Sequence, residues 1–246
     1  MTTVAVLADP PRSDVVLPNL VTSSPLSGTD VVDLYTALLC DTVLAAERSG
    51  GELLVNYRPG DALGIDVDSE AEIRSVLDGV VDADSVRFEV QVGETFAGRV
   101  GNTATHLLET EGVGSVGITY PEAALLARTD IDGAAMKLRS SPVVLGPAPG
   151  GRVTYAAFSE PIDYADSYAP PALETLTDRA LDSGLDVDFL ETKPYLRTAT
   201  DLAELVVQVR TRAKAGAIVP PHLASWIADS DLGVTAEADG SLKLRR

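Results

Sequence analysis

The sequence predicts an α/β fold with a mostly parallel sheet that has helices on both faces. Short, continuous apolar runs alternate along the chain with longer segments whose apolar residues repeat at helical spacing. This alternation is typical of βαβ units, and a continuous apolar run is typical of a strand buried on both faces. The chain has 246 residues, 45% of them hydrophobic, which is enough for a sizeable core.

The predicted strands share an apolar stretch that is bounded by turn-forming residues. They are 3–8, 52–57, 85–92, 112–119, 141–148, 152–158 and 185–191. Gly150-Gly151 is the expected turn between two of them. Because ligands of such sheets sit beyond the carboxyl ends of the parallel strands, the loops that follow the strands are the first place to look for a site.

The predicted helices share apolar residues three and four positions apart. They are 29–50, 69–77, 95–112, a segment that starts near Pro121, 171–184, 198–216 and 220–231. Thr29 or Asp30 is the expected N-cap of the first helix. Asp68 or Ser69 is the expected N-cap of the second, where Glu72 would complete a capping box.

The remaining segments read as loops and a C-terminal extension. Residues 9–28, 60–68 and 159–170 are polar or proline-bearing, and a hairpin is expected about Asp239-Gly240. We therefore expect an α/β domain over 1–216 and an extension over 217–246 that consists of a short helix plus a hairpin.

The charge of the chain excludes several partners. Asp and Glu number 37 against 19 Lys and Arg, which gives a net charge of −18. A dispersed negative surface repels nucleic acids and anionic membranes. No apolar run is long enough to span a bilayer, and the N-terminus has no secretory pattern. These features predict an acidic, cytoplasmic protein, and the scarcity of Lys favours a halophilic source whose self-repulsion is screened by salt.

Familiar catalytic motifs are absent from the sequence. The first predicted strand is followed by ADPPRSD, without the G-x-G-x-x-G fingerprint, and neither a P-loop nor a G-x-S-x-G elbow is present. His106 and His222 are the two histidines, too few for a His-rich metal site. Cys40 lies on the apolar side of a predicted helix and is expected to be a buried, inert thiol.

Acidic residues after strands are the remaining candidates for a metal site, because Mg²⁺ prefers carboxylate oxygens. They are Asp9, Asp61, Asp66 and Asp68. Asp9 is the best placed, since it directly follows the first predicted strand. The other three lie in a loop where acidity needs no special reason in so acidic a chain.

The order of several segments resembles a known group of proteins. DLYTALLCDTVLAAERSG is followed by QVGETFAGRV, GSVGITYPEA, VVLGPAPGG and a late ATDLAEL helix. This order is similar to that of an uncharacterised glycosyltransferase-A-fold (GT-A) family related to the molybdenum-cofactor and phospholactate guanylyltransferases. The resemblance covers roughly residues 1–212. It implies a Rossmann-like, nucleotide-diphospho-sugar transferase type of sheet, and a nucleotide or nucleotide sugar as a partner.

The chain departs from the pattern of that family where the family holds its metal. The strand-end acid corresponds to Thr119, a second acid to Pro149, and an Asp-x-Asp to the stretch 195–197. Of the basic first loop only Arg12 remains. The resemblance therefore implies a degenerate member with no metal ligands and no cofactor, in which metal-dependent transfer is lost while ligand binding is kept.

Two other functions stay open: an active nucleotidyl- or glycosyltransferase that uses Asp9, with Mg²⁺, or arginines, and a non-catalytic structural or regulatory subunit. No catalytic residue is assigned. The candidate ligand-binding residues, carried by the resemblance and by strand-end position, are Ala8, Asp9, Arg12, Gln91, Gly93, Arg99, Thr119, Pro121 and Arg152. Arg12 and Arg99 are the expected phosphate contacts, because Arg is the natural bidentate partner of phosphate.

Overall fold

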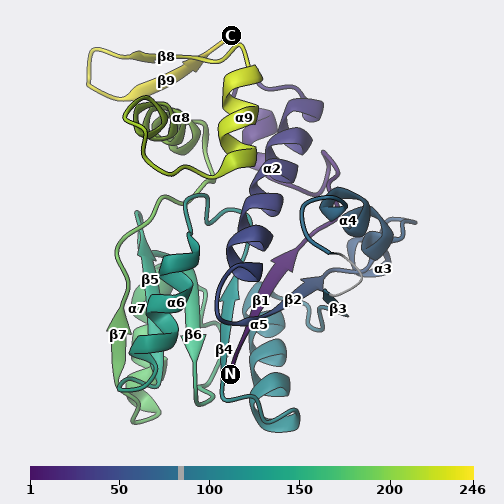
Figure 1. Cartoon of the computed structure of the whole chain (residues 1–246), viewed down its shortest axis with the longest axis vertical. Helices are drawn as coiled ribbons and strands as arrows, with labels where there is room; N and C mark the ends of the chain where they lie inside the picture. The colour runs from purple at the N-terminus through teal and green to yellow at the C-terminus, as the bar shows by residue number, and fades with distance from the viewer. Residues whose placement is uncertain (83–85) are drawn as a thin grey trace.

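A computed structural model describes residues 1–82 and 86–246 and confirms the predicted fold class. Its main sheet has the strand order β3-β2-β1-β4-β6-β5-β7 (Figure 1). The strands are β1 (Thr2–Ala8), β2 (Glu52–Tyr57), β3 (Arg87–Val90), β4 (Ser115–Thr119), β5 (Val143–Ala148), β6 (Arg152–Phe158) and β7 (Val187–Phe189). Ser85, the first residue of one predicted strand, lies outside the described residues.

The sheet is parallel except at β6, which runs antiparallel to both β4 and β5. The cause is the turn at Gly150-Gly151, where both glycines have positive φ, 75° and 66°, and the chain returns directly beside β5. A parallel neighbour would instead need a long crossover. The sheet is therefore mixed but mostly parallel.

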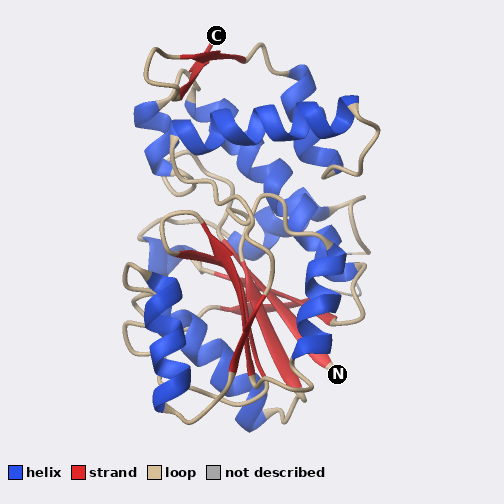
Figure 2. Cartoon of the chain, turned by 90° about the vertical axis from the view of Figure 1, so that its left-hand side faces the viewer, coloured by secondary structure: helices blue, strands red, loops and turns tan. Residues whose placement is uncertain are grey.

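Helices cover both faces of the sheet (Figure 2). One face packs against α2 (Gly28–Glu47), α4 (Ser69–Leu77) and α6 (Arg128–Lys137), whereas α8 (Ala199–Lys214) lies beyond the end of the sheet, beside the C-terminal residues (Figure 1). The other packs against α5 (Phe96–Thr105), its π-helical continuation η1 (His106–Thr110), and α7 (Ala172–Asp182). Within β1, Val4 and Val6 face the first set while Ala5 and Leu7 face the second, as the two-residue period of a strand requires. Cys40 is buried, as expected.

Several predicted boundaries are wrong. Ser27, and neither Thr29 nor Asp30, is the N-cap of α2, and Asp30 completes its capping box. Two short helices, α1 (Pro18–Ser23) and α3 (Gly60–Leu63), interrupt segments predicted as loops. The segment after Pro121 is a series of turns, and α6 begins only at Arg128. Local turn hydrogen bonds, such as that from the Ala123 amide to the Tyr120 carbonyl, use the backbone groups there.

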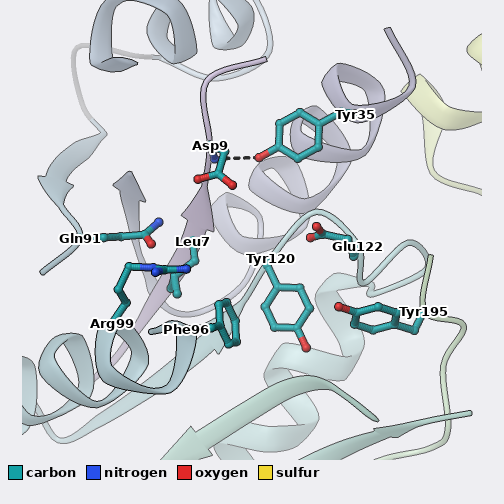
Figure 3. Close-up of a pocket in the computed structure, with 9 residues that line it drawn as sticks. All are labelled: Leu7, Asp9, Tyr35, Gln91, Phe96, Arg99, Tyr120, Glu122 and Tyr195. Carbon is teal, nitrogen blue, oxygen red and sulfur yellow. Dashed lines mark hydrogen bonds between the residues drawn. The ribbon is translucent and has the colours of Figure 1, made fainter. Parts of the chain in front are cut away.

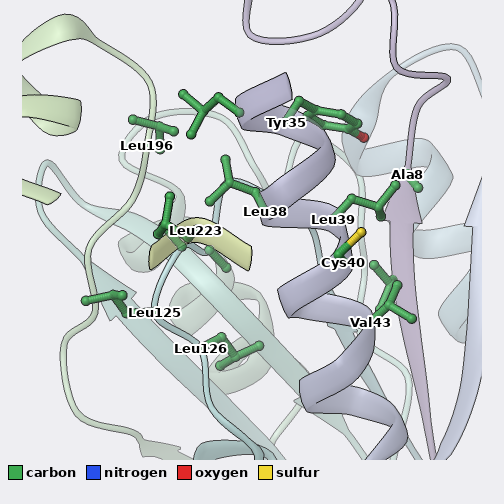
Figure 4. Close-up of a cluster of buried hydrophobic side chains, with 14 of the residues drawn as sticks. Ala8, Tyr35, Leu38, Leu39, Cys40, Val43, Leu125, Leu126, Leu196 and Leu223 are labelled. Carbon is green, nitrogen blue, oxygen red and sulfur yellow. The ribbon is translucent and has the colours of Figure 1, made fainter. Parts of the chain in front are cut away.

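The C-terminal residues form α9 (Pro221–Asp229) and the hairpin β8 (Gly233–Ala236) and β9 (Leu242–Arg245), as predicted. This extension lies beyond the end of the sheet to which the parallel strands point (Figures 1 and 2). Ile227 and Leu223 of α9 are buried in the same hydrophobic cluster as residues of α2, and Leu223 is seen beside that helix in Figure 4. The division at 216/217 stays a prediction. Among the described residues, no helix is long and apolar enough to cross a bilayer.

Candidate functional site

A cavity of about 170 Å³ lies at the carboxyl ends of β1 and β4 (Figure 3). The chain passes from β1 outward through β2 and β3 and then returns to place β4 on the other side of β1, so this is the switch point of the sheet. Such a point is where open α/β sheets bind ligands. The lining residues are Leu7, Asp9, Tyr35, Gln91, Phe96, Arg99, Tyr120, Glu122 and Tyr195.

Asp9 is held by an ion pair with Arg58. The two Asp9 carboxylate oxygens accept hydrogen bonds from Arg58 Nε and Nη2 at 2.5 and 2.6 Å. The register of β1 and β2 explains the pairing, because Ala8 lies beside Tyr57 and the next residues therefore lie side by side. The Asp9 amide also donates to the Tyr35 hydroxyl at 2.8 Å. The Asp9 carboxylate is thus fixed in place, and the Arg58 guanidinium balances its negative charge at this side of the cavity.

Arg99 faces Asp9 from the first turns of α5 and has no carboxylate partner in the described residues. Its Nη1 donates to the Glu94 carbonyl at 3.3 Å, and its buried Nε has no hydrogen-bond partner. Burial and the nearby Arg58 guanidinium lower the pKa of Arg99. A half-buried, unpaired cation in a protein of net charge −18 is energetically costly unless an anion joins it.

Glu122 lies across the cavity from Arg99, on the loop that follows β4 (Figure 3). Burial raises the pKa of Glu122 to about 7, and the Asp9 carboxylate adds to the rise. Its backbone carbonyl accepts from the Leu196 amide at 2.9 Å, which ties this loop to the segment that carries Tyr195. Glu122 can therefore gain or lose a proton near neutral pH, as a general acid or base must.

A second cavity of about 260 Å³ adjoins the first and shares Phe96, Tyr120 and Tyr195 with it. Arg152 and Arg197 also line it. The Arg152 guanidinium lies 5.3 Å from the centre of the Tyr195 ring, and neither arginine has a carboxylate partner in residues 1–82 and 86–246. The aromatic rings between the cavities make edge-to-face contacts, with Phe96 and Tyr120 centroids 5.3 Å apart.

Of the uncharged predicted residues, Gln91 lines the first cavity, whereas Ala8 and Gly93 line neither cavity and lie beside residues that do. Gln91 Nε2 donates to the carbonyls of Ala8 and Asn56, at 3.2 and 2.7 Å, and so ties the ends of β1 and β2 together. Gly93 has a φ of 130°, and a Cβ there would lie 2.9 Å from the Arg99 amide nitrogen. Only glycine lets this loop approach α5 so closely.

Thr119, Pro121 and Arg12 also lie outside the lining of both cavities. The fully buried Thr119 donates its hydroxyl proton to the Thr154 carbonyl at 3.0 Å. Pro121 is buried in the turn between Tyr120 and Glu122. Arg12 is turned to Glu72, with 3.0 Å between Nε and Oε2. The structure thus brings together Asp9, Gln91 and Arg99, with Arg152 in the adjoining cavity.

The residues present do not fit the divalent cation that the alternative function, an active transferase using Asp9 with Mg²⁺, would need here. Both Asp9 carboxylate oxygens already accept hydrogen bonds from Arg58. The Thr119 hydroxyl donates to a carbonyl inside the core. The raised pKa of Glu122 favours its neutral carboxyl form. In the described part of the chain, no group of three or more His, Cys, Asp or Glu could hold a metal ion.

Sequence reasoning missed Glu122 and Arg58, and it named the stretch 195–197 only as the counterpart of a lost Asp-x-Asp, without assigning Tyr195 to a site. Arg58 could have been found, because the predicted strands 3–8 and 52–57 both end one residue before a charged side chain of opposite sign. Glu122 also follows a strand closely, but it was assigned to a helix. Tyr195 is brought in by tertiary structure alone.

Comparison with solved structures shows the fold. A protein of Desulfovibrio desulfuricans, provisionally named a nucleotide-diphospho-sugar transferase, matches with a TM-score of 0.76 at 16% identity, over 92% of this chain and 96% of that one. The 4-diphosphocytidyl-2C-methyl-D-erythritol synthase of Anaerococcus prevotii matches with a TM-score of 0.53 at 13% identity, over 85% and 96%. A nucleotidyl transferase from Methanothermobacter gives 0.50 at 14%, over 86% and 99%.

No protein-family model and no curated protein sequence matches the chain. At these low identities the structural matches carry the fold and not the activity. The chain therefore has a fold similar to that of nucleotide-diphospho-sugar transferases and nucleotidyltransferases.

Proposed function

We propose that this protein binds a nucleotide or nucleotide sugar in the two adjoining cavities, without a divalent metal, and that metal-dependent transfer has been lost. The observation that carries the proposal is Arg99, a half-buried guanidinium without a carboxylate partner among the described residues, in a chain with an excess of acid. A phosphate would supply the missing partner, since guanidinium and phosphate form strong, charge-assisted hydrogen bonds.

The adjoining cavity supplies the rest of the binding surface. Arg152 and Arg197 offer further positive charge, and Tyr195 offers a ring beside it. Aromatic faces stack on nucleobases and on the apolar faces of sugars, and fixed cations stabilise phosphate charge in the absence of a metal. The proposal is also supported by the shared fold with proteins named for nucleotide-sugar and nucleotidyl transfer.

Isothermal titration in 2–3 M KCl (a range in which the surface charge is well screened) tests the proposal. Nucleoside mono-, di- and triphosphates and nucleotide sugars are titrated with EDTA or with Mg²⁺. We expect binding of at least one nucleotide in EDTA, and a loss of tenfold or more in Arg99→Ala. Arg139→Ala is the matched control, because Arg139 is exposed and lies outside both cavities. Failure of every nucleotide to bind, or binding that Arg99→Ala leaves intact, contradicts the proposal.

Glu122 favours a second candidate function, an active transferase that works with arginines and a carboxyl instead of a metal. A carboxyl with a pKa of about 7 beside a cationic cavity has the properties of a general base for an attacking hydroxyl. Turnover of a nucleotide sugar in EDTA that disappears in Glu122→Gln would establish this function in place of the first.

A further inference from the structure

A third cavity, remote from the strand-end site, lies between the α/β domain and the C-terminal extension. It has a volume of about 500 Å³ and is lined from α2, from the segment before α6, from the end of α8 and from residues 218–221 before α9. We call it the α2–α9 cleft. It shares no lining residue with the two cavities described above. Its volume is within the range of about 300–1,000 Å³ that is typical of small-molecule sites.

The floor of the α2–α9 cleft is apolar. Leu44 of α2 and Leu125 and Leu126 of the segment before α6 contribute to it, and the last two lie beside α2 in Figure 4. At the lip, Ile218 is 96% exposed. An isoleucine left almost wholly in water beside an apolar hollow gains free energy when an apolar group covers both.

The lining of the cleft has more basic than acidic residues, whereas the chain as a whole has more acidic than basic ones. Arg48, Arg128, Lys193 and Arg212 line it, whereas Asp41 is the one acidic residue in its described lining. Asp41 is already engaged, because its oxygens accept from the His222 and Leu223 amides at 3.0 and 2.8 Å. The chain as a whole has 37 acidic and 19 basic residues, so this local excess of cations is against the composition.

Two of these cations have partners and two do not. Lys193 pairs with Asp130 at 3.0 Å and Arg128 with Asp132 at 3.7 Å. Arg48, at the end of α2, and Arg212, in the last turn of α8, have no carboxylate within ion-pair distance in the part of the chain that the structure describes. Both are exposed at the edge of the cleft. They are the groups available to an incoming anion.

We propose that the α2–α9 cleft binds a small amphipathic anion, with its apolar body on Leu44, Leu125, Leu126 and Ile218 and its carboxylate or phosphate head at Arg48 and Arg212. The C-terminal extension then has a role, since residues 218–221 form one wall of this second site. A concave, mostly apolar hollow with a few fixed charges favours a small ligand over a flat protein contact. The proposal is independent of the nucleotide site.

Thermal shift and isothermal titration of the full chain, with soluble short-chain probes below their micellar concentration, test the proposal. The probes are octanoate and octyl phosphate, which distinguish the two head groups, and octanol and inorganic phosphate, which each carry one half of the ligand. We expect octanoate or octyl phosphate to bind and the two half-ligands to bind at least tenfold more weakly. Arg48→Ala/Arg212→Ala should weaken the binding tenfold or more, and Ile218→Ser should weaken it as well.

Arg139→Ala is the matched control, since it removes an exposed arginine outside the cleft that has no ion pair with the described residues, and it should leave octanoate and octyl phosphate binding unchanged. The double arginine variant changes only exposed side chains, so its melting temperature should stay near that of the unmodified protein. Absence of binding by both amphipathic probes overturns the proposal. So does binding that is equal for octanol, or equal in the double arginine variant, because either result shows unspecific apolar adsorption.

Discussion

The Asp9 carboxylate and the Arg58 guanidinium are joined by two parallel hydrogen bonds of 2.5 and 2.6 Å across the ends of β1 and β2. Asp9 directly follows the first strand and is the residue that sequence reasoning singled out as a metal ligand, and its carboxylate is bound to Arg58 instead. A bidentate pair of this kind fixes both side chains. One side of the cavity therefore consists of two fixed side chains whose charges balance each other. Arg99 and Glu122, which have no such partner in the described residues, are the charged groups that can interact with a ligand.

The first prediction is that Asp9 and Arg58 are energetically coupled. Both side chains are about a quarter exposed, so solvent weakens their attraction only in part. A double-mutant cycle of Asp9→Ala, Arg58→Ala and the double variant, measured by denaturant unfolding, should give a coupling free energy of about 1–3 kcal/mol. The more exposed Arg12 and Glu72 pair, cycled in the same way, should show a smaller coupling. Equal coupling in the two cycles would contradict the role given to Arg58.

The second prediction is that divalent cations do not change nucleotide affinity. Asp9 is bound to Arg58 and Thr119 faces the core, so the described lining of the cavity has no two free carboxylates that could hold Mg²⁺ together. Titration of a bound nucleotide in the presence of Mg²⁺ or Mn²⁺ should match titration in EDTA at equal ionic strength. Tight binding that requires Mg²⁺ would show that the acids of this chain hold a metal elsewhere.

The second prediction extends to Thr119: restoring the lost acid there should not create a metal site, for a reason that the structure supplies. Thr119 is fully buried and its hydroxyl donates to the Thr154 carbonyl, so Thr119→Asp would place a carboxylate without a donor inside the core. We expect this variant to unfold or to lose several kcal/mol, about the cost of an unpaired buried charge, rather than to gain a metal. Thermal melting with and without Mn²⁺ checks the outcome.

The third prediction concerns pH and Glu122. Its pKa is raised from an ordinary value of 4.5 to about 7, so between these values the folded state holds a proton that the unfolded state has lost. Stability should therefore fall as the pH rises from about 5 to about 8. Nucleotide affinity should fall over the upper part of this range, because an ionised Glu122 repels phosphate. The groups that act on Glu122 are Asp9 and Arg58, which oppose each other.

Glu122→Gln removes the titrating group and should flatten both curves, whereas Glu109→Gln, at an exposed position of η1, should leave them as in the unmodified protein. The measurements are urea unfolding and nucleotide titration at closely spaced pH values and constant salt. A Glu122→Gln variant that keeps the full pH dependence would assign it to another group, such as the buried Asp41, whose pKa is also raised by burial.

The fold could be predicted because its signals are local. The strands 52–57 and 152–158 have the predicted bounds, since a glycine pair precedes each apolar run and charged or polar residues follow it. The helix N-caps Asp68 and Thr198 were among those expected for the same reason. The strand 185–191 proved shorter, with β7 limited to Val187–Phe189 at the sheet edge, where β5 is its one neighbouring strand in the described part of the chain.

The site residues that could be predicted from the sequence are those that lie shortly after the end of a predicted strand. Asp9, Gln91 and Arg99 lie in or next to such loops and do line the cavity. Glu122 and Tyr195 come together through a backbone hydrogen bond between residues 122 and 196, which no local pattern specifies. Arg12 is basic and lies in the first loop, yet its guanidinium forms an ion pair with Glu72 of α4 instead of facing the cavity. In so acidic a chain, which arginines stay unpaired is a property of the tertiary structure.

The fourth prediction is that the protein needs salt. Its net charge of −18 is dispersed, and salt screens the repulsion between like charges. The melting temperature should rise as KCl is increased from roughly 0.1 M to 3 M, over which the Debye length shrinks strongly. Sodium chloride should act like KCl, since screening depends on ionic strength. An unchanged melting temperature would contradict the halophilic origin inferred from composition.

The last prediction concerns Asp41, which joins α2 to the C-terminal extension. Its two carboxylate oxygens accept from the first amides of α9, at His222 and Leu223, so a side chain of one helix caps another that follows it by some 180 residues. Charge-assisted caps of this kind stabilise a helix N-terminus, and removing one leaves buried amides unsatisfied. Asp41→Ala should lower the free energy of unfolding by about 1–3 kcal/mol. It should also loosen α9, so that proteases cut the exposed segment 215–218 more quickly.

Asp33→Ala is the matched control, because Asp33 lies on the same helix, is exposed, and its side chain makes no hydrogen bond or ion pair with α9 among the described residues. Limited proteolysis followed by mass spectrometry locates the cuts. If Asp41→Ala and Asp33→Ala are cut at the same rate and melt together, the cap does not hold the extension in place. If cleavage in Asp41→Ala releases an intact fragment that ends near residue 216, the extension packs as a separable unit on the α/β domain, as the domain boundary at 216/217 predicts.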